Sequence, residues 1–176
     1  MDQLSLRRTI DLWQREPERA LGKPAVTGHA QGTRAALQSG SFQWEADLPE
    51  ALGGSGKAPS PTQLLLSALA GCAVVFLADT LAPQLGVPLE AVAATARCRA
   101  DSRGLLGMAG VSPDLQDVEL EIELTSSAPE PALRQLLAVW EERCPIYRAL
   151  IAPTAVALRW KTAAHEQPAA GGAGRL

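Results

Sequence analysis

The chain has 176 residues, with 16 Lys and Arg against 19 Asp and Glu, and its formal net charge is −3 at neutral pH. This length favours one domain that buries a core without metal or disulfide staples. The mild charge, the lack of a basic tract and an aromatic content of 4% disfavour nucleic acid as a partner.

Residues 1–22 form a charged N-terminal arm, in which one helical turn is expected near Leu12–Arg19. The arm has no apolar run that would act as a signal peptide. The three cysteines of the chain are too few, and odd in number, for a secreted disulfide scaffold. We therefore expect a cytoplasmic, reducing location.

Two polar–apolar segments, 24–37 and 41–47, flank a Ser-Gly pair at 39–40, which predicts two strands of a hairpin. A loop rich in Gly, Pro and Ser follows at 49–60.

The tetrapeptide SPTQ at 60–63 marks the start of a long helix, because it combines a serine N-cap, a first-turn proline and a capping-box glutamine. The helix is expected to run to about Leu85, where Gly86 supplies a left-handed cap. It is apolar nearly all round, so it should be buried on every side. A single small domain surrounds such a helix poorly, and a second copy of the chain would help to cover it. The apolar run 64–78 is shorter than the ~20 residues of a membrane span and ends at Asp79.

The second half of the chain alternates strands with a helix. Residues 91–100 and Asp117–Leu124 alternate apolar and polar side chains, which predicts strands with one wet face. An amphipathic helix is expected over about Pro131–Arg143, and Pro145 ends it. The next residues, IYRAL, fit a further turn or short helix.

The fold is predicted to end with a strand at Ala155–Lys161, which carries Val156, Leu158 and Trp160 on one face. Residues 163–176 are expected to form a flexible tail. This order of elements predicts an α+β fold over residues 23–162.

Two of the three cysteines are candidates for chemistry. Cys72 lies about three turns into the apolar helix, where burial raises the pKa of a thiol. We therefore interpret it either as an inert core residue or as an attacking thiol that needs a nearby cation. Cys144 directly precedes Pro145. If it is the N-cap of a new helical turn, the helix dipole and the nearby Arg143 and Arg148 would stabilise its thiolate. The alternative is that Cys144 only marks the point where the preceding helix ends. Cys98 is interpreted as core.

The stretch LPEALGGSGKAPSPTQLLLSALAGCAVVFL at 48–77 and the later ERCPIYRAL at 142–150 resemble the OsmC/Ohr family. The shared features are the Gly-rich loop, the Ser-Pro helix start, the central Gly-Cys and the later Cys-Pro, and with the strand order the resemblance covers about residues 25–161. It implies an intertwined homodimer with two long central helices wrapped by sheets that mix strands from both chains. It also implies thiol-based reduction of small organic hydroperoxides.

The resemblance also implies roles for individual residues. Cys72 would be the peroxidatic cysteine and Cys144 the resolving cysteine, and a dithiol reductant, lipoyl-type in some members, would restore both thiols. Arg34 would hold the peroxide and stabilise the thiolate, with Gln63 and Phe76 on the substrate side. The family places a glutamate near the start of the long helix to orient the arginine, whereas this chain has Thr62-Gln63 there.

Other signals are weaker. The GSGK at 54–57 lacks the flanking residues of a phosphate loop. His29 and His165 are far apart, and the chain has no Cys-x-x-Cys, so no metal and no cofactor are expected. Two other hypotheses remain open: a dimer of this fold whose apolar cleft binds a hydrophobic ligand, with non-catalytic or redox-sensing thiols, and a purely structural dimer.

Overall fold

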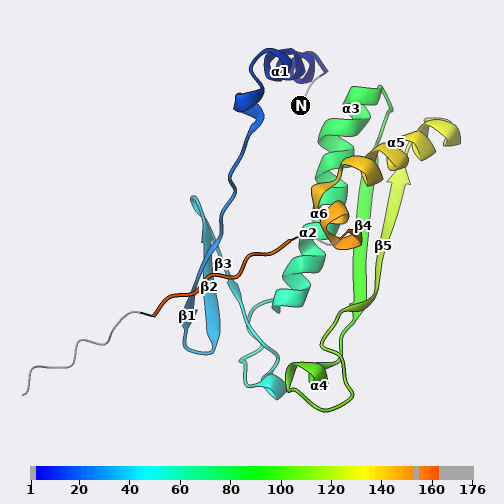
Figure 1. Cartoon of the computed structure of the whole chain (residues 1–176). Helices are drawn as coiled ribbons and strands as arrows, with labels where there is room; N and C mark the ends of the chain where they lie inside the picture. Colours follow the sequence, from blue (N-terminus) through cyan, green and yellow to red (C-terminus); the bar gives the residue numbers. More distant parts are fainter. Residues whose placement is uncertain (1–2, 153–154, 163–176) are drawn as a thin grey trace, which may run out of the picture.

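The computed structural model describes residues 3–152 and 155–162, which form a mixed α+β fold with two small antiparallel sheets around a long helix (Figure 1). The first sheet has the order β1-β2-β3, and the second pairs β4 with β5. The five strands are β1 Thr27–Gln31, β2 Arg34–Ser39, β3 Phe42–Ala46, β4 Ala91–Arg99 and β5 Gln116–Thr125.

The first sheet corrects the predicted hairpin in one respect. The segment 24–37 does not form a single strand, because a turn at Gly32, with φ of 61°, divides it into β1 and the first part of β2. The predicted turn between β2 and β3 is confirmed: Ser39 pairs with Phe42 across Gly40, which has φ of 56°. Both glycines adopt the left-handed conformation that other residues rarely tolerate.

The predicted long helix is confirmed from its first residue to its last. It comprises α2 Pro61–Phe76, one π-helical turn η3 at Leu77–Leu81, and α3 Ala82–Leu85. The capping box at Ser60 is complete, and Gly86 ends the helix with φ of 67°. The π turn is the one feature that the apolar pattern did not predict.

The core lies where this helix meets β4 and the helix α5, Glu130–Arg143. Its fully or nearly fully buried members are Leu69, Ala73, Leu77, Leu81, Ala82, Leu136, Trp140 and Cys144. By length and composition alone, Pro61–Leu85 could cross a membrane, with a mean hydropathy of 2.1. Core helices of soluble proteins meet the same criterion, but only 22% of its most apolar stretch is buried within this chain.

The strands and helices predicted between residues 91 and 151 are present. β4, and β5 from Leu120 onward, alternate half-buried and exposed positions. The helix α5 ends at Cys144, where α6, Pro145–Ile151, begins. A short helix α4, Ser102–Leu105, lies in the connection between the two strands.

The N-terminal arm is more helical than predicted. A helix α1 spans Gln3–Arg15, and a 3₁₀ turn follows at Pro17–Ala20. The signal was an apolar stripe at helical spacing, Leu6, Ile10 and Trp13. Leu6 is buried, and α1 contacts α3.

The strand predicted at Ala155–Lys161 is wrong for the single chain. Residues 155–162 have no regular secondary structure, and Val156, Leu158 and Trp160 are each more than 80% exposed. A strand needs a hydrogen-bonded neighbour, and the described part of this chain gives the segment none. The tail predicted at 163–176 lies outside the described residues.

Candidate functional site

Two cysteines that are 72 residues apart meet in the core. The Sγ atoms of Cys72, on α2, and Cys144, between α5 and α6, are 3.0 Å apart, and both residues are reduced. A disulfide needs an S–S distance of about 2.05 Å, so the sulfurs would have to approach by only about 1 Å. The arrangement therefore permits direct bridging within one chain.

Pro145 explains why Cys144 lies at this point. It ends α5 and starts α6, so Cys144 is at once the C-cap of one helix and the N-cap of the next. The Cys144 N–H donates to the Trp140 carbonyl at 2.8 Å, and the Tyr147 N–H donates to the Cys144 sulfur at 3.4 Å. The predicted N-cap position is confirmed, and the side chain is fully buried.

Cys72 has the raised pKa that its apolar setting predicts. Burial raises the pKa of this thiol to about 11, with a further contribution from the hydrogen bond and proximity to Cys144. A backbone hydrogen bond from Ile146 offsets part of the shift. A thiol with this pKa is almost wholly protonated at neutral pH, so in the single chain Cys72 is a poor nucleophile.

A cavity of about 470 Å³ opens on Cys72. It is lined by Cys72, Val75, Phe76, Asp79, Thr80 and Pro145. Phe76 therefore lines the same cavity as Cys72, as its helical spacing from that residue predicts. None of the six lining residues is basic, so the cation that a thiolate needs is not supplied to this cavity by the described part of the chain.

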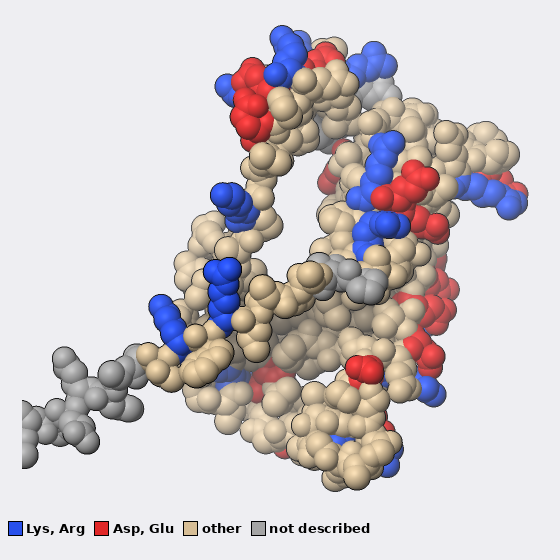
Figure 2. Space-filling model, viewed as in Figure 1, with Lys and Arg blue, Asp and Glu red and all other residues tan. Residues whose placement is uncertain are grey.

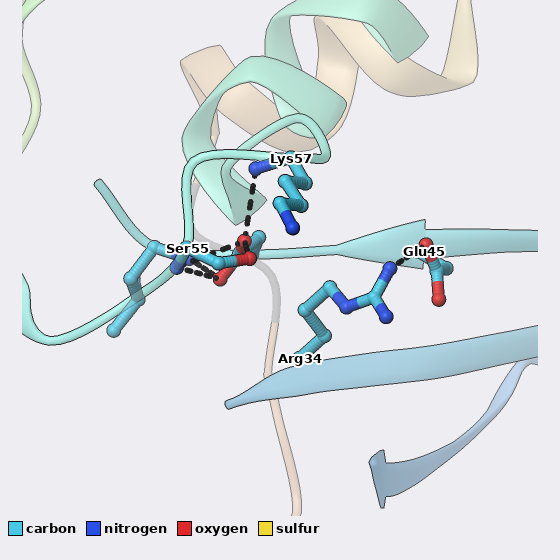
Figure 3. Close-up of polar contacts among 6 residues, drawn as sticks. Arg34, Glu45, Ser55 and Lys57 are labelled. Carbon is cyan, nitrogen blue, oxygen red and sulfur yellow. Dashed lines mark hydrogen bonds and ion pairs between the residues drawn. The ribbon is translucent and has the colours of Figure 1, made fainter. Parts of the chain in front are cut away.

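Arg34 lies in a different part of the molecule. It extends from β2 and forms an ion pair with Glu45 on β3, with 2.6 Å between Nη1 and Oε2 (Figure 3). It lines a separate cavity of about 570 Å³ together with His29 and Asp47. The structure of one chain thus does not bring Arg34 to Cys72.

Glu45 is a carboxylate partner of Arg34 that the sequence reasoning missed. Its register was the available signal: Glu45 pairs with Ala36, so it lies diagonally across from Arg34 on the same face of the sheet. The expected acid near the helix start is missing in this chain, and Glu45 is the acid that pairs with the arginine instead.

Gln63 is occupied elsewhere. Its Oε1 accepts the Ser60 N–H at 2.8 Å, and its own N–H donates to the Ser60 hydroxyl at 3.3 Å. It lines a third cavity, of about 520 Å³, beside Thr62 and the half-buried Cys98. The structure therefore places Gln63 at the helix cap and not beside Cys72.

Asp47 organises the Gly-rich loop that precedes α2. Its buried carboxylate accepts the Ser55 hydroxyl at 2.6 Å and the backbone N–H groups of Leu48, Ser55 and Lys57 (Figure 3). These bonds, led by the Ser55 hydroxyl, lower the pKa of Asp47 to about 2 against an opposing effect of burial. A Cβ at Gly54 would lie 1.8 Å from the Leu48 carbonyl oxygen, so this glycine serves a tight loop.

Within residues 3–152 and 155–162, no three His, Cys, Asp or Glu side chains gather in a way that could hold a metal ion. The chemistry that the described residues support is that of the two thiols.

An α+β fold with a long central helix and two reduced thiols in contact defines a dithiol protein. The family model for OsmC-like proteins matches residues 54–159, which is more than half of the chain. The chain therefore belongs to the OsmC-like family. Comparison with curated proteins gives no match.

Several solved structures share the fold. An OsmC-like protein from Mycoplasma pneumoniae has a TM-score of 0.64 at 20% identity, over 75% of this chain and 89% of that one. The organic hydroperoxide resistance protein OsmC from Legionella pneumophila has a TM-score of 0.58 at 23% identity, over 74% and 90%. An organic hydroperoxide resistance protein from Elizabethkingia anophelis has a TM-score of 0.59 at 19% identity, over 76% and 91%.

Proposed function

We propose that this chain reduces organic hydroperoxides, with Cys72 as the peroxidatic cysteine and Cys144 as the resolving cysteine. The observation that carries the proposal is the 3.0 Å separation of the two sulfurs, one of which, that of Cys72, belongs to a residue that lines a cavity. Membership of the OsmC-like family, and the names of two of its structural neighbours as organic hydroperoxide resistance proteins, support it.

The chemistry needs two thiols and one peroxide. The Cys72 thiolate attacks the terminal peroxide oxygen, the O–O bond breaks, and the alkoxide leaves as an alcohol after it takes up a proton, so that Cys72 becomes a sulfenic acid. The Cys144 thiol then attacks the Cys72 sulfur, and water leaves as the disulfide forms. A dithiol reductant reopens the disulfide by thiol–disulfide exchange and is itself oxidised to a disulfide. A reducing cytoplasm fits this cycle.

A second copy of the chain would complete the site. Among the described residues none that lines the Cys72 cavity is basic, while Arg34, held by Glu45, lies on a sheet that stands apart from α2 (Figure 1). We propose a homodimer in which Arg34 of one copy reaches Cys72 of the other. The arginine would lower the pKa of the Cys72 thiol and hold the peroxide oxygens.

The uncovered apolar surface supports this assembly. On α2, Leu65 is 38% exposed, and the strand-patterned segment 155–161 has no partner within the described chain. Figure 2 shows a wide opening between the N-terminal part of the molecule and its helical body. Sedimentation equilibrium should give a mass of twice 18.5 kDa. A monomer at micromolar concentration would contradict the assembly.

Intact-mass spectrometry tests the peroxidase. One equivalent of tert-butyl hydroperoxide should lower the mass of the reduced wild-type chain by about 2 Da, as two thiols become a disulfide. In Cys144→Ser, Cys72 should instead gain about 16 Da as a sulfenic acid, which dimedone traps. Cys98→Ser, which removes the third thiol, should behave as the wild type. A Cys72 thiol that stays free in excess peroxide would refute the proposal.

A second function is favoured by the cavity at the start of α2. Its volume of about 520 Å³ and its leucine and proline lining, which includes Leu52, Leu66 and Leu115, suit an acyl chain. In this alternative the thiols are non-catalytic or redox-sensing. Equal peroxide consumption by wild type and Cys72→Ser, together with saturable binding of a fluorescent fatty acid that Leu66→Trp blocks, would favour it over the peroxidase.

A further inference from the structure

Two polar side chains lie at the far end of the Cys72 cavity. Asp79 and Thr80 belong to the π turn η3, seven and eight residues beyond Cys72 on the same helix, which corresponds to about 10 Å along its axis. Single π turns within α-helices occur frequently at functional sites. This turn places the two polar groups in the same cavity as the thiol.

The carboxylate of Asp79 has no partner within the described part of the chain. The structure shows no hydrogen bond or ion pair for its carboxylate among residues 3–152 and 155–162, unlike Glu45, which is paired with Arg34. The carboxylate is exposed at the cavity wall and is available to a ligand. The Thr80 hydroxyl beside it can donate or accept one further hydrogen bond.

The wall between the thiol and the carboxylate is apolar. Val75, Phe76 and Pro145 complete the lining, so a ligand that contacts both ends of the cavity must have an apolar middle. At about 470 Å³ the cavity is in the size range of small-molecule sites. A short alkyl chain between a reactive group and a polar end fits this arrangement.

We propose that Asp79 and Thr80 make the cavity selective for hydroperoxides that carry a cationic or hydrogen-bond-donating group four or five carbons from the O–O bond. The same carboxylate disfavours hydroperoxides that end in a carboxylate, as those of fatty acids do. The proposal rests on the proposed peroxidase function of Cys72 and names its substrate class. Asp79 acts here on substrate binding at the far end of the cavity, about 10 Å along the helix from Cys72, where the proposed Arg34 of the second copy would act.

The size of the effect follows from exposed ion pairs. A solvent-exposed pair contributes about 0.2–1 kcal/mol, and a like-charged pair costs a similar amount. Attraction of an ammonium and repulsion of a carboxylate together favour the cationic substrate by roughly fivefold. Because the carboxylate is exposed, this preference should shrink as salt is added.

Two matched hydroperoxides test the proposal. The probes are 5-hydroperoxy-5-methylhexylammonium and 5-hydroperoxy-5-methylhexanoate, which share the tertiary peroxide and differ in the charge of the far end. The readout is the second-order rate constant of disulfide formation in the reduced full-length chain at low salt, followed by quenched mass spectrometry. The ammonium compound should react about five times faster than the carboxylate.

Three variants assign the preference to Asp79. In Asp79→Asn the ratio of the two rates should fall toward one, and in Asp79→Glu it should be retained. Glu123→Gln, which removes an exposed carboxylate from β5 away from the cavity, should keep the wild-type ratio. Equal rates in the wild type, or an unchanged ratio in Asp79→Asn, would overturn this proposal alone. Failure of both compounds and of tert-butyl hydroperoxide to oxidise Cys72 would overturn the peroxidase as well.

Discussion

Replacing Arg34 by glutamine removes the charge that we propose activates Cys72. Within one chain the pKa of Cys72 is raised to about 11, chiefly by burial, and the part of the chain that the structure describes gives its cavity no basic side chain. If Arg34 of a second copy supplies that charge, the wild-type dimer has a Cys72 pKa well below this value. In Arg34→Gln the pKa of Cys72 should then return to about 11, the value set chiefly by burial.

The magnitude follows from the ionised fraction. At pH 8, a thiol with a pKa of about 11 is ionised to about one part in a thousand, whereas an adjacent arginine that brings the pKa to about 7 ionises about nine-tenths of it. The more basic thiolate is also the better nucleophile, and a Brønsted coefficient of ~0.4–0.5 recovers roughly 60-fold of this loss. The net effect of Arg34→Gln on the peroxide rate at pH 8 is therefore a decrease of about 15-fold.

Alkylation of the reduced protein by iodoacetamide measures the pKa directly. Peptide-resolved mass spectrometry reads each of the three cysteines separately, so the native set of thiols is kept. The Cys72 profile should have its midpoint near or below pH 8 in the wild type and near pH 11 in Arg34→Gln. Arg97→Gln is the matched control, because Arg97 is also an ion-paired strand arginine but bonds to Glu119 and Glu121.

Cys72 profiles of wild type and Arg34→Gln that superimpose would show that Arg34 does not activate the thiol. A wild-type midpoint near pH 11 would show that no cation reaches the thiol in the assembled protein. A shift in Arg97→Gln equal to that in Arg34→Gln would show that the change reflects general charge and not a specific contact.

Three further substitutions test separate parts of the account. Glu45→Gln frees Arg34 from its ion pair, and since exposed pairs contribute about 0.2–1 kcal/mol, the rate of Cys72 oxidation should fall by about 1.4- to fivefold. A rate equal to that of wild type would remove Glu45 from the site. Asp47→Asn weakens the acceptor that holds the Gly-rich loop, so it should lower the melting temperature at pH 7. The pKa of Asp47 in the folded protein is about 2, below the usual 3.8, so its stabilisation is present above about pH 4 and is lost as the pH falls toward 2. The melting temperatures of wild type and Asp47→Asn should therefore converge in acid. A difference that stays constant with pH would contradict this role of Asp47. Leu136→Ala empties a fully buried core position and should cost about 2–5 kcal/mol in urea denaturation, whereas a cost below 1 kcal/mol would place Leu136 outside the core.

Elements with strong local signals were predictable from the sequence. The long helix has a capping box at Ser60 and a left-handed glycine at Gly86, and both were found as expected. The turn at Gly40 and the stop at Pro145 follow from the same kind of residue-level constraint. In each case one or two residues determine the local backbone.

Other elements depended on contacts that the sequence does not specify. The alternation of 155–161 predicted a strand, but a strand forms only against a neighbouring edge, and the described chain provides none. The π turn at Leu77–Leu81 carries no separate pattern within an apolar helix. At Gly32 the strand prediction followed the alternation and overlooked a glycine that reverses the chain.

The candidate site was only partly predictable. The raised pKa of Cys72 followed from its apolar helix, and the cap position of Cys144 followed from Pro145. Their contact across 72 residues did not follow from spacing, and only the family resemblance pointed to it. The catalytic roles of both cysteines and of Arg34 remain predictions.

Peptide mapping after one equivalent of tert-butyl hydroperoxide is the most direct test of the central claim. Digestion without reduction should yield one new disulfide linkage, Cys72 to Cys144. Mixing of isotope-labelled and unlabelled chains should show that the linkage lies within a single chain, because the two sulfurs are 3.0 Å apart in one chain. Cys98 should remain a free thiol. A linkage between chains, a linkage through Cys98, or two unmodified thiols at Cys72 and Cys144 would contradict the account.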